Sequence, residues 1–288
     1  MSVPIAYLGV IMIWSTTPLA IKWSGETGVL FGVTTRMLLA ASLCLVIIAL
    51  MRVKFPWHKR ARRSYFAVSI AIYGAMITTY WGAQFIPSGL ISVIFGMTPI
   101  VTSIFTMILL GERDINIKKW AGMILGIIGL AIIFHAELNI NANSIKGFLA
   151  VLLAVFLYSF SSVWVKRENV SIPALAMTAG GLLVALPFYG ITWLLIGTET
   201  VPTTISTRGL LSIVYLGIFG SVIGFMFYYY IIKNIDVKKV ALITLITPII
   251  ALILGQYLNG ENIHMTIWLG SGIVLIGLAI YQFDELIF

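Results

Sequence analysis

Apolar residues fall into ten long runs that short polar linkers separate. A helix that crosses the hydrocarbon core of a bilayer needs about 20 mostly apolar residues, and each run comes near that length. The ten predicted spans cover residues 3–22, 29–51, 64–86, 89–110, 118–135, 146–166, 173–196, 209–233, 238–258 and 265–283. The pattern predicts an all-α integral membrane protein with ten transmembrane helices and no large soluble part.

The composition agrees with that pattern. Of the 288 residues, 60% are hydrophobic and 10% are charged, whereas a soluble domain carries roughly 25% charged residues. The net charge of +8 is spread over short clusters between the apolar runs. We interpret these clusters as signals for orientation in the membrane, and we expect no nucleic-acid partner.

Basic residues are concentrated in alternate linkers. Fourteen lie on one predicted side of the membrane: Arg52, Lys54, Lys59, Arg60, Arg62, Arg63, Arg113, Lys118, Lys119, Lys166, Arg167, Lys233, Lys238 and Lys239. The opposite linkers hold only Lys22, Lys146 and Arg208. Because Lys and Arg mark cytoplasmic loops, we expect both termini to be cytoplasmic.

The two halves of the chain resemble each other. Trp14, Ser15 and Lys22 recur as Tyr158, Ser159 and Lys166. A second pattern joins a Thr-Pro pair to a Gly-Glu pair that begins twelve residues after the proline. Its two copies are Thr98, Pro99, Gly111 and Glu112, and Thr247, Pro248, Gly260 and Glu261. A repeat of five helices has odd parity, so the copies 1–144 and 145–288 are expected to cross the membrane in opposite directions, as in many secondary transporters.

These residues resemble the ten-helix EamA branch of the drug/metabolite transporter superfamily. The likeness rests on Trp14 with Lys22, on Thr35-Arg36 before a Met-Leu-Leu-Ala run, on Tyr80-Trp81, and on the repeated Thr-Pro and Gly-Glu pairs. The resemblance implies a basket of ten helices around a central cavity, with the fifth and tenth helices peripheral. It also implies a carrier in a bacterial inner membrane, many relatives being exporters of amino acids and other metabolites. One departure is Gly180, which stands where a second copy of Arg36 would fall.

Pro99 and Pro248 occupy matched positions within predicted spans. A proline inside a helix removes a backbone hydrogen bond and bends or opens the helix. We predict a pair of hinges beside the substrate. The alternative is that both prolines only shape helix packing, because proline is common in membrane helices.

Arg36 lies inside the second predicted span. An ionisable residue in the bilayer is a functional candidate by default, and a guanidinium suits an anionic group of a substrate. The alternatives are that Arg36 extends its charge outward to the interface, or pairs with Glu26 or a helix-end carbonyl.

Other candidates for the substrate pocket are aromatic or weakly polar. Tyrosine and tryptophan offer an apolar face with one polar group, although many such residues belong to an interfacial belt. Threonine and glutamine offer hydrogen bonds, although threonine also bonds its own helix. The candidates are Trp14, Thr17, Tyr80, Trp81, Gln84, Thr98, Tyr158, Tyr229 and Thr247.

All ten acidic residues lie in linkers, at helix ends or in the C-terminal tail. A proton-coupled exporter of lipophilic cations needs a carboxylate within the membrane, so the sequence argues against one. The three histidines are scattered, and we expect no metal, no cofactor and no enzyme site.

The sequence therefore favours a secondary transporter that exports a small neutral or zwitterionic metabolite by alternating access, in particular an apolar or aromatic amino acid. The expected partners are that substrate and the lipid bilayer, with a monomer as the working expectation. A flippase for a lipid-linked group is the main alternative, and a membrane enzyme is a weaker one.

Overall fold

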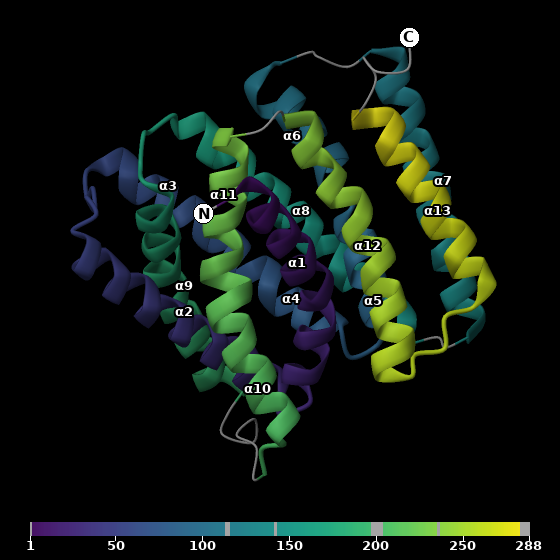
Figure 1. Cartoon of the computed structure of the whole chain (residues 1–288), viewed down its shortest axis with the longest axis horizontal. Helices are drawn as coiled ribbons and strands as arrows, with labels where there is room; N and C mark the ends of the chain where they lie inside the picture. The colour runs from purple at the N-terminus through teal and green to yellow at the C-terminus, as the bar shows by residue number, and fades with distance from the viewer. Residues whose placement is uncertain (1, 113–115, 141–142, 197–203, 235–236, 283–288) are drawn as a thin grey trace.

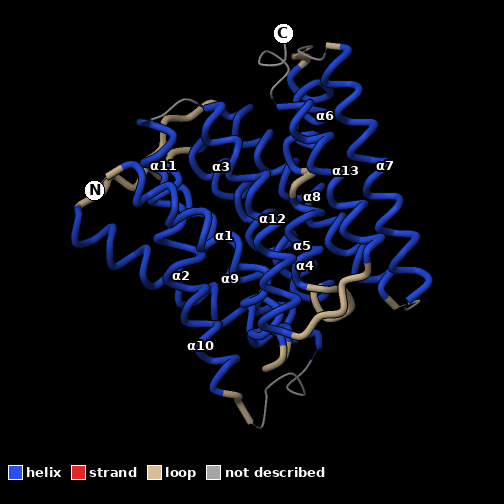
Figure 2. The backbone as a smooth tube through the Cα atoms, turned by 45° about the vertical axis from the view of Figure 1, so that its right-hand side comes forward, coloured by secondary structure: helices blue, strands red, loops and turns tan. Residues whose placement is uncertain are grey.

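The structure is a computed structural model that describes residues 2–112, 116–140, 143–196, 204–234 and 237–282. Every regular element in these ranges is a helix. The elements are α1 (Val3–Gly25), α2 (Val29–Met51), α3 (Lys59–Ser69), η1 (Ile70–Ala75), α4 (Met76–Gly82), α5 (Ser88–Phe95), α6 (Thr98–Leu110), α7 (Ile117–Ile140), α8 (Ser144–Glu168), α9 (Ala174–Ile196), α10 (Thr207–Tyr215), η3 (Leu216–Ile223), α11 (Gly224–Asn234), α12 (Val237–Asn259) and α13 (Met265–Gln282). Figure 2 shows these helices joined by short loops.

Nine helices or continuous helix stacks among the described residues are long and apolar enough to cross a membrane. They correspond to nine of the ten predicted spans, and the chain is a multi-pass membrane protein. The third predicted span is the stack of α3, η1 and α4. It begins in a basic segment at Lys59 and ends with the polar and aromatic side chains of Thr78, Thr79, Tyr80 and Trp81. Its passage through the membrane remains a prediction.

The bundle turns its large apolar side chains outward, as a lipid environment requires. Leu50, Leu194 and Leu195 are 79%, 85% and 81% exposed. In the interior, by contrast, several hydroxyl groups are buried, among them those of Ser15, Ser159 and Ser271. The outer surface is thus more hydrophobic than parts of the core.

The helices are arranged around α1, which packs against α5, α10, α11 and α12 (Figure 1). On one side of it, α9 contacts both α2 and α3. On the other side, α8 contacts α4, α6 and η1. Helices α7 and α13 lie side by side at the edge of the bundle, so the fifth and tenth predicted helices are peripheral.

Two stacks contain a π-helical segment, η1 in the third span and η3 in the eighth. A π-helical segment widens the turn and is often found at functional sites. Each is followed directly by an α-helix, α4 or α11, so the chain keeps its direction through the irregular turns. These two segments are the main departures from regular helix inside the bundle.

The fourth predicted span is two helices rather than one. Helix α5 ends at Phe95, a tight turn covers Gly96 and Met97, and α6 begins at Thr98. Pro99 therefore lies in the first turn of α6, where its missing N–H breaks no helical bond. Pro248 differs, because it lies inside the continuous helix α12. The expectation that both prolines are mid-helix is thus wrong for Pro99.

Glycines allow α7 and α13 to approach at backbone distance. A Cβ on Gly122 would lie 2.5 Å from the Gly277 carbonyl oxygen, and one on Gly277 would lie 2.6 Å from the Gly126 nitrogen. Without a hydrophobic force between helices in lipid, such small residues make close packing possible. Gly272, on the same helix α13, has no neighbour within 4 Å of an added Cβ.

We therefore expect Gly277→Leu to destabilise the protein by roughly 1–3 kcal/mol, the usual cost of overpacking. Gly272→Leu is the matched control, because it makes the same change of helix propensity in open space. Thermal unfolding in detergent would compare the two. Equal melting temperatures for both variants would contradict the close contact of α7 and α13.

Candidate functional site

Arg36 is buried in the interior of the bundle, with 5% of its surface exposed. Its Nε donates to the Ser221 hydroxyl of η3 at 3.2 Å, while Nη1 is buried and has no hydrogen-bond partner among the described residues. Glu26, the acid considered as its partner in the sequence, instead accepts two bonds from Arg208 at 2.6 and 2.7 Å. That proposed pairing is therefore wrong. Burying the Arg36 charge without a carboxylate partner among the described residues lowers the stability of the fold. An arginine in such a position is therefore a candidate functional residue.

The segment facing Arg36 is built from small residues. A Cβ added to Gly220 would lie 3.5 Å from Arg36 Nη2 and 3.7 Å from Thr17 Oγ1. A Cβ added to Gly224 would lie 3.5 Å from Trp14 Nε1. At these two glycines no side chain stands between the backbone of η3 and α11 and the polar groups of α1 and α2. Trp14, Thr17 and Arg36, all candidates from the sequence, are brought together here.

Two buried tyrosines border the same region. Tyr189 of α9 donates to the Ile72 carbonyl of η1 at 2.7 Å, and it interacts electrostatically with Arg36 and Tyr80. The Tyr80 hydroxyl accepts a bond from Ser24 at 3.2 Å. Tyr80 was a sequence candidate and is fully buried. Tyr189 and Ser221 were missed, because neither residue belongs to a repeated motif.

The remaining candidates are dispersed. Tyr158 forms an edge contact with Phe95 at 6.3 Å, and Thr98 donates to the Phe95 carbonyl of its own span. Thr247 is buried in α12. Trp81 and Gln84 are exposed, with Trp81 against the ring of Phe85 at 4.9 Å, which favours an interfacial position for the tryptophan. The side chain of Tyr229 lies outside the described residues.

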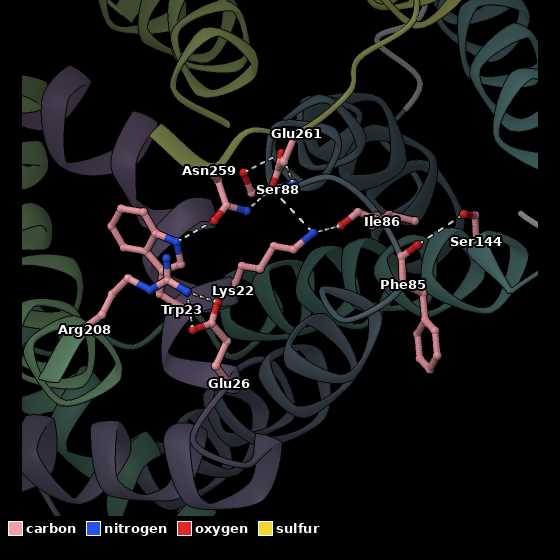
Figure 3. Close-up of polar contacts among 10 residues, drawn as sticks. All are labelled: Lys22, Trp23, Glu26, Phe85, Ile86, Ser88, Ser144, Arg208, Asn259 and Glu261. Carbon is pink, nitrogen blue, oxygen red and sulfur yellow. Dashed lines mark hydrogen bonds and ion pairs between the residues drawn. The ribbon is translucent and has the colours of Figure 1, made fainter. Parts of the chain in front are cut away.

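A polar network closes one end of the bundle near the last turn of α1 (Figure 3). Lys22 Nζ donates to the Ile86 carbonyl at 2.8 Å and lies 3.5 Å from Glu261 Oε1. Glu261 Oε2 accepts from the backbone N–H of Ser88 at 2.8 Å and from its hydroxyl at 3.0 Å. The Glu261 side chain is only 6% exposed. One carboxylate thus joins α1, α5 and the chain after α12.

Asn259 extends this network toward α10. Its amide nitrogen donates to Glu261 at 2.8 Å, and its oxygen accepts from Trp23 Nε1 at 2.8 Å. The Arg208 guanidinium lies over the Trp23 ring at 5.3 Å and pairs with Glu26. We call the set Lys22, Trp23, Glu26, Ser88, Arg208, Asn259 and Glu261 the end network; all of its residues are labelled in Figure 3.

The other repeat contains an ion pair equivalent to Lys22–Glu261. Lys166 and Glu112, the counterparts of Lys22 and Glu261, pair at 2.7 Å. Their side chains are 57% and 50% exposed, against 24% and 6% in the first pair. The preceding glycines, Gly111 and Gly260, both have positive φ, 71° and 62°. In the sequence these residues are visible only as a repeated motif, because nothing in the motif shows that the lysine and the glutamate of each repeat meet.

We expect Glu261→Gln to lower stability by about 3 kcal/mol, because it leaves the half-buried Lys22 without its charge partner. The matched substitution Glu112→Gln should cost less than about 1 kcal/mol, because an exposed pair contributes little. Thermal unfolding of both purified variants measures the difference. Equal losses would show that the buried and exposed pairs are energetically alike.

The comparisons with known proteins agree with a membrane carrier. The profile of the EamA-like transporter family matches residues 1–135 and again 145–282, so the chain belongs to that family. An uncharacterized transporter of Bacillus subtilis, YoaV, is 26% identical, with 98% of this chain and 97% of that protein aligned. The uncharacterized inner membrane transporter YedA of Escherichia coli is 24% identical, with 98% and 91% aligned.

Two further matches extend this picture. Protein PagO of Salmonella typhimurium is 27% identical over 91% of this chain and 86% of its own length. One solved crystal structure matches with a TM-score of 0.68 at 18% identity, covering 100% of this chain and 99% of that one. The protein is thus a membrane transporter of the EamA family, and it shares its fold with that solved structure.

Proposed function

We propose that the protein exports a small neutral or zwitterionic metabolite, in particular an apolar or aromatic amino acid. The observation that carries the proposal is the buried guanidinium of Arg36, whose Nη1 has no hydrogen-bond partner in the part of the chain that the structure describes. A carboxylate is the natural ligand for it, because guanidinium and carboxylate match in charge and in geometry. We call the region formed by Trp14, Thr17, Arg36, Gly220 and Gly224 the niche. Its single described cation suits a substrate with one carboxylate.

The surroundings of Arg36 suit the rest of an amino acid. Trp14 stands beside the niche with its ring 4.9 Å from that of Tyr228, which offers an aromatic wall. Gly220 and Gly224 bring backbone, and no side chain, to the polar groups around Arg36. No carboxylate among the described residues pairs with Arg36, so a cationic substrate would meet the guanidinium charge without a compensating negative charge.

The helix contacts support two inverted repeats, residues 1–144 and 145–288. Helix α1 contacts η3 and α11, and its counterpart α8 contacts η1 and α4. Likewise α12 packs on α1 as α6 packs on α8, and η3 packs on α2 as α3 packs on α9. The two matches to the family profile also divide the chain in this way. A ten-helix carrier with this duplication is built for alternating access.

The two ion pairs support a state that is closed at one end. The pair Lys22–Glu261 is largely buried within the end network, while Lys166–Glu112 is exposed. The bias of basic residues places the first pair outside and the second in the cytoplasm. In this proposal the structure is closed to the outside, and both termini are cytoplasmic. During export the pair Lys22–Glu261 would become exposed and the pair Lys166–Glu112 would become buried.

Arg36 provides the direct test. Arg36→Gln should reduce export of the substrate on the order of tenfold or more, because a hydrogen-bonded charge partner for the carboxylate is lost. The assay is mass spectrometry of amino acids in the medium of expressing bacteria, followed by counterflow in proteoliposomes. Arg60→Gln is the control, since that arginine is exposed at the start of α3 and belongs neither to the residues around Arg36 nor to the end network.

Unchanged export by Arg36→Gln would overturn the role of the arginine. If no metabolite accumulates although the protein is inserted, scrambling of labelled lipid-linked cargo in the same proteoliposomes would favour the flippase.

The proline hinges give a second test. Pro248→Ala should slow turnover several-fold while leaving substrate affinity unchanged, because a regular helix α12 resists the bend that the cycle needs. Pro99→Ala should do the same for a different reason, because alanine would let the helix continue across the break between α5 and α6. Pro187→Ala is the control: this proline lies inside α9, is exposed, and has no counterpart in the other repeat. Flux equal to wild type in both hinge variants would show that the prolines serve packing only.

A further inference from the structure

Three basic side chains and two aromatic rings surround an open pocket at the start of α3. The pocket has a volume of about 290 Å³ and is lined by Lys59, Arg62, Arg63, Phe66 and Trp164. The first four recur at intervals of three and four residues, so they share one face of α3. Trp164 comes from α8, which packs against α3. We call these five residues the basic pocket.

The cations of the basic pocket form no ion pair within the described part of the chain. None of the ion pairs or hydrogen bonds there involves the side chains of Lys59, Arg62 or Arg63. Glu168 is the nearby acid on α8, and its carboxylate accepts from Trp164 Nε1 at 3.3 Å instead. Clustered cations at a helix N-terminus also oppose the helix dipole. A bound anion would reduce both the repulsion among the three cations and their unfavourable interaction with the helix dipole.

The inner side of the basic pocket is apolar. The Phe66 ring meets that of Trp164 at 5.9 Å, and Trp164 meets Phe160 at 5.6 Å. Nearby, Phe55, Trp57 and Tyr65 stack on one another, and Trp57 is 57% exposed. Such aromatic groups are typical of the headgroup level of a bilayer. The basic pocket therefore lies where headgroups and the first acyl carbons meet.

We propose that the basic pocket binds the headgroup of an anionic phospholipid of the cytoplasmic leaflet. The phosphate would lie among Lys59, Arg62 and Arg63, and the glycerol end of the acyl chains would lie along Phe66 and Trp164. Orientation by positive charge alone needs basic residues at this end, but it does not need them to share one pocket with aromatic walls. A lipid held here would tie α3 to α8, across the two repeats.

The test uses a pair of matched triple variants. Lys59→Gln/Arg62→Gln/Arg63→Gln removes the three cations of the basic pocket. Arg52→Gln/Lys54→Gln/Arg60→Gln removes three exposed cations of the same linker that do not line it. Both change the net charge by the same amount, so general attraction to an anionic surface falls equally.

Native mass spectrometry of delipidated protein would measure binding of added phosphatidylglycerol, diphosphatidylglycerol and phosphatidylethanolamine. We expect the wild type to prefer the two anionic lipids. The first triple variant should bind them more weakly, on the order of tenfold or more, while the second stays within about twofold of wild type. Equal losses in the two variants, or equal binding of phosphatidylethanolamine by the wild type, would overturn the proposal.

Two further measurements allow for a variant that does not fold and distinguish a lipid from a free phosphate. If the first triple variant does not fold, the melting temperature of the wild-type protein is measured with each lipid. Phosphatidylglycerol should raise this temperature, and phosphatidylethanolamine should not. Inorganic phosphate and the deacylated headgroup glycerophosphoglycerol are added in parallel. Stabilisation by these soluble anions as strong as by the lipid would identify the ligand as a free phosphate and refute the lipid site.

Discussion

A guanidinium buried in a bundle that faces lipid is the constraint around which the interior of this protein is organised. Moving the charge of Arg36 out of water costs several kcal/mol even after relaxation, and one hydroxyl bond from Ser221 offsets only a small part of that cost. Glu26 does not neutralise the Arg36 charge, because its carboxylate is hydrogen-bonded to Arg208 instead. The glycines of the eighth span and the tyrosines of α4 and α9 therefore form a polar niche within an otherwise apolar core.

Irregular backbone is concentrated near the places where polar groups are buried. In lipid, a backbone carbonyl without a helical partner must find another donor or a wet cavity. Segment η3 carries Ser221 toward Arg36, and the Ile72 carbonyl of η1 is bonded by Tyr189. The break before Thr98 is similar, because the carbonyl of Phe95 accepts from the threonine hydroxyl at 2.6 Å. The departures from regular helix are thus compensated by specific side chains.

Hydrophobic runs were enough to locate the helices, because a spanning helix is long and nearly free of charge. They failed where a helix changes type. The third span begins five residues before its predicted start at residue 64, because the basic residues from Lys59 onward are helical too. The break before Pro99 and the π-helical segments leave no periodic trace in sequence. Trp14, Thr17 and Arg36 were predicted from motif and depth, whereas Ser221 and Tyr189 reach the niche only through tertiary packing.

The two halves of the chain differ at the position of the buried arginine. The counterpart of Arg36 is Gly180, and a Cβ there would collide with the ring of Tyr65. Space that holds a guanidinium in one repeat is filled by an aromatic ring of α3 in the other, which brings α3 and α9 together. The same contact positions Tyr65, whose hydroxyl bonds the Pro56 carbonyl just before α3. In the proposed transport cycle, the matched helices and ion pairs would serve the two states, while a single glycine in place of an arginine makes the proposed binding site one-sided. The proposed substrate, with one carboxylate, needs only one such site.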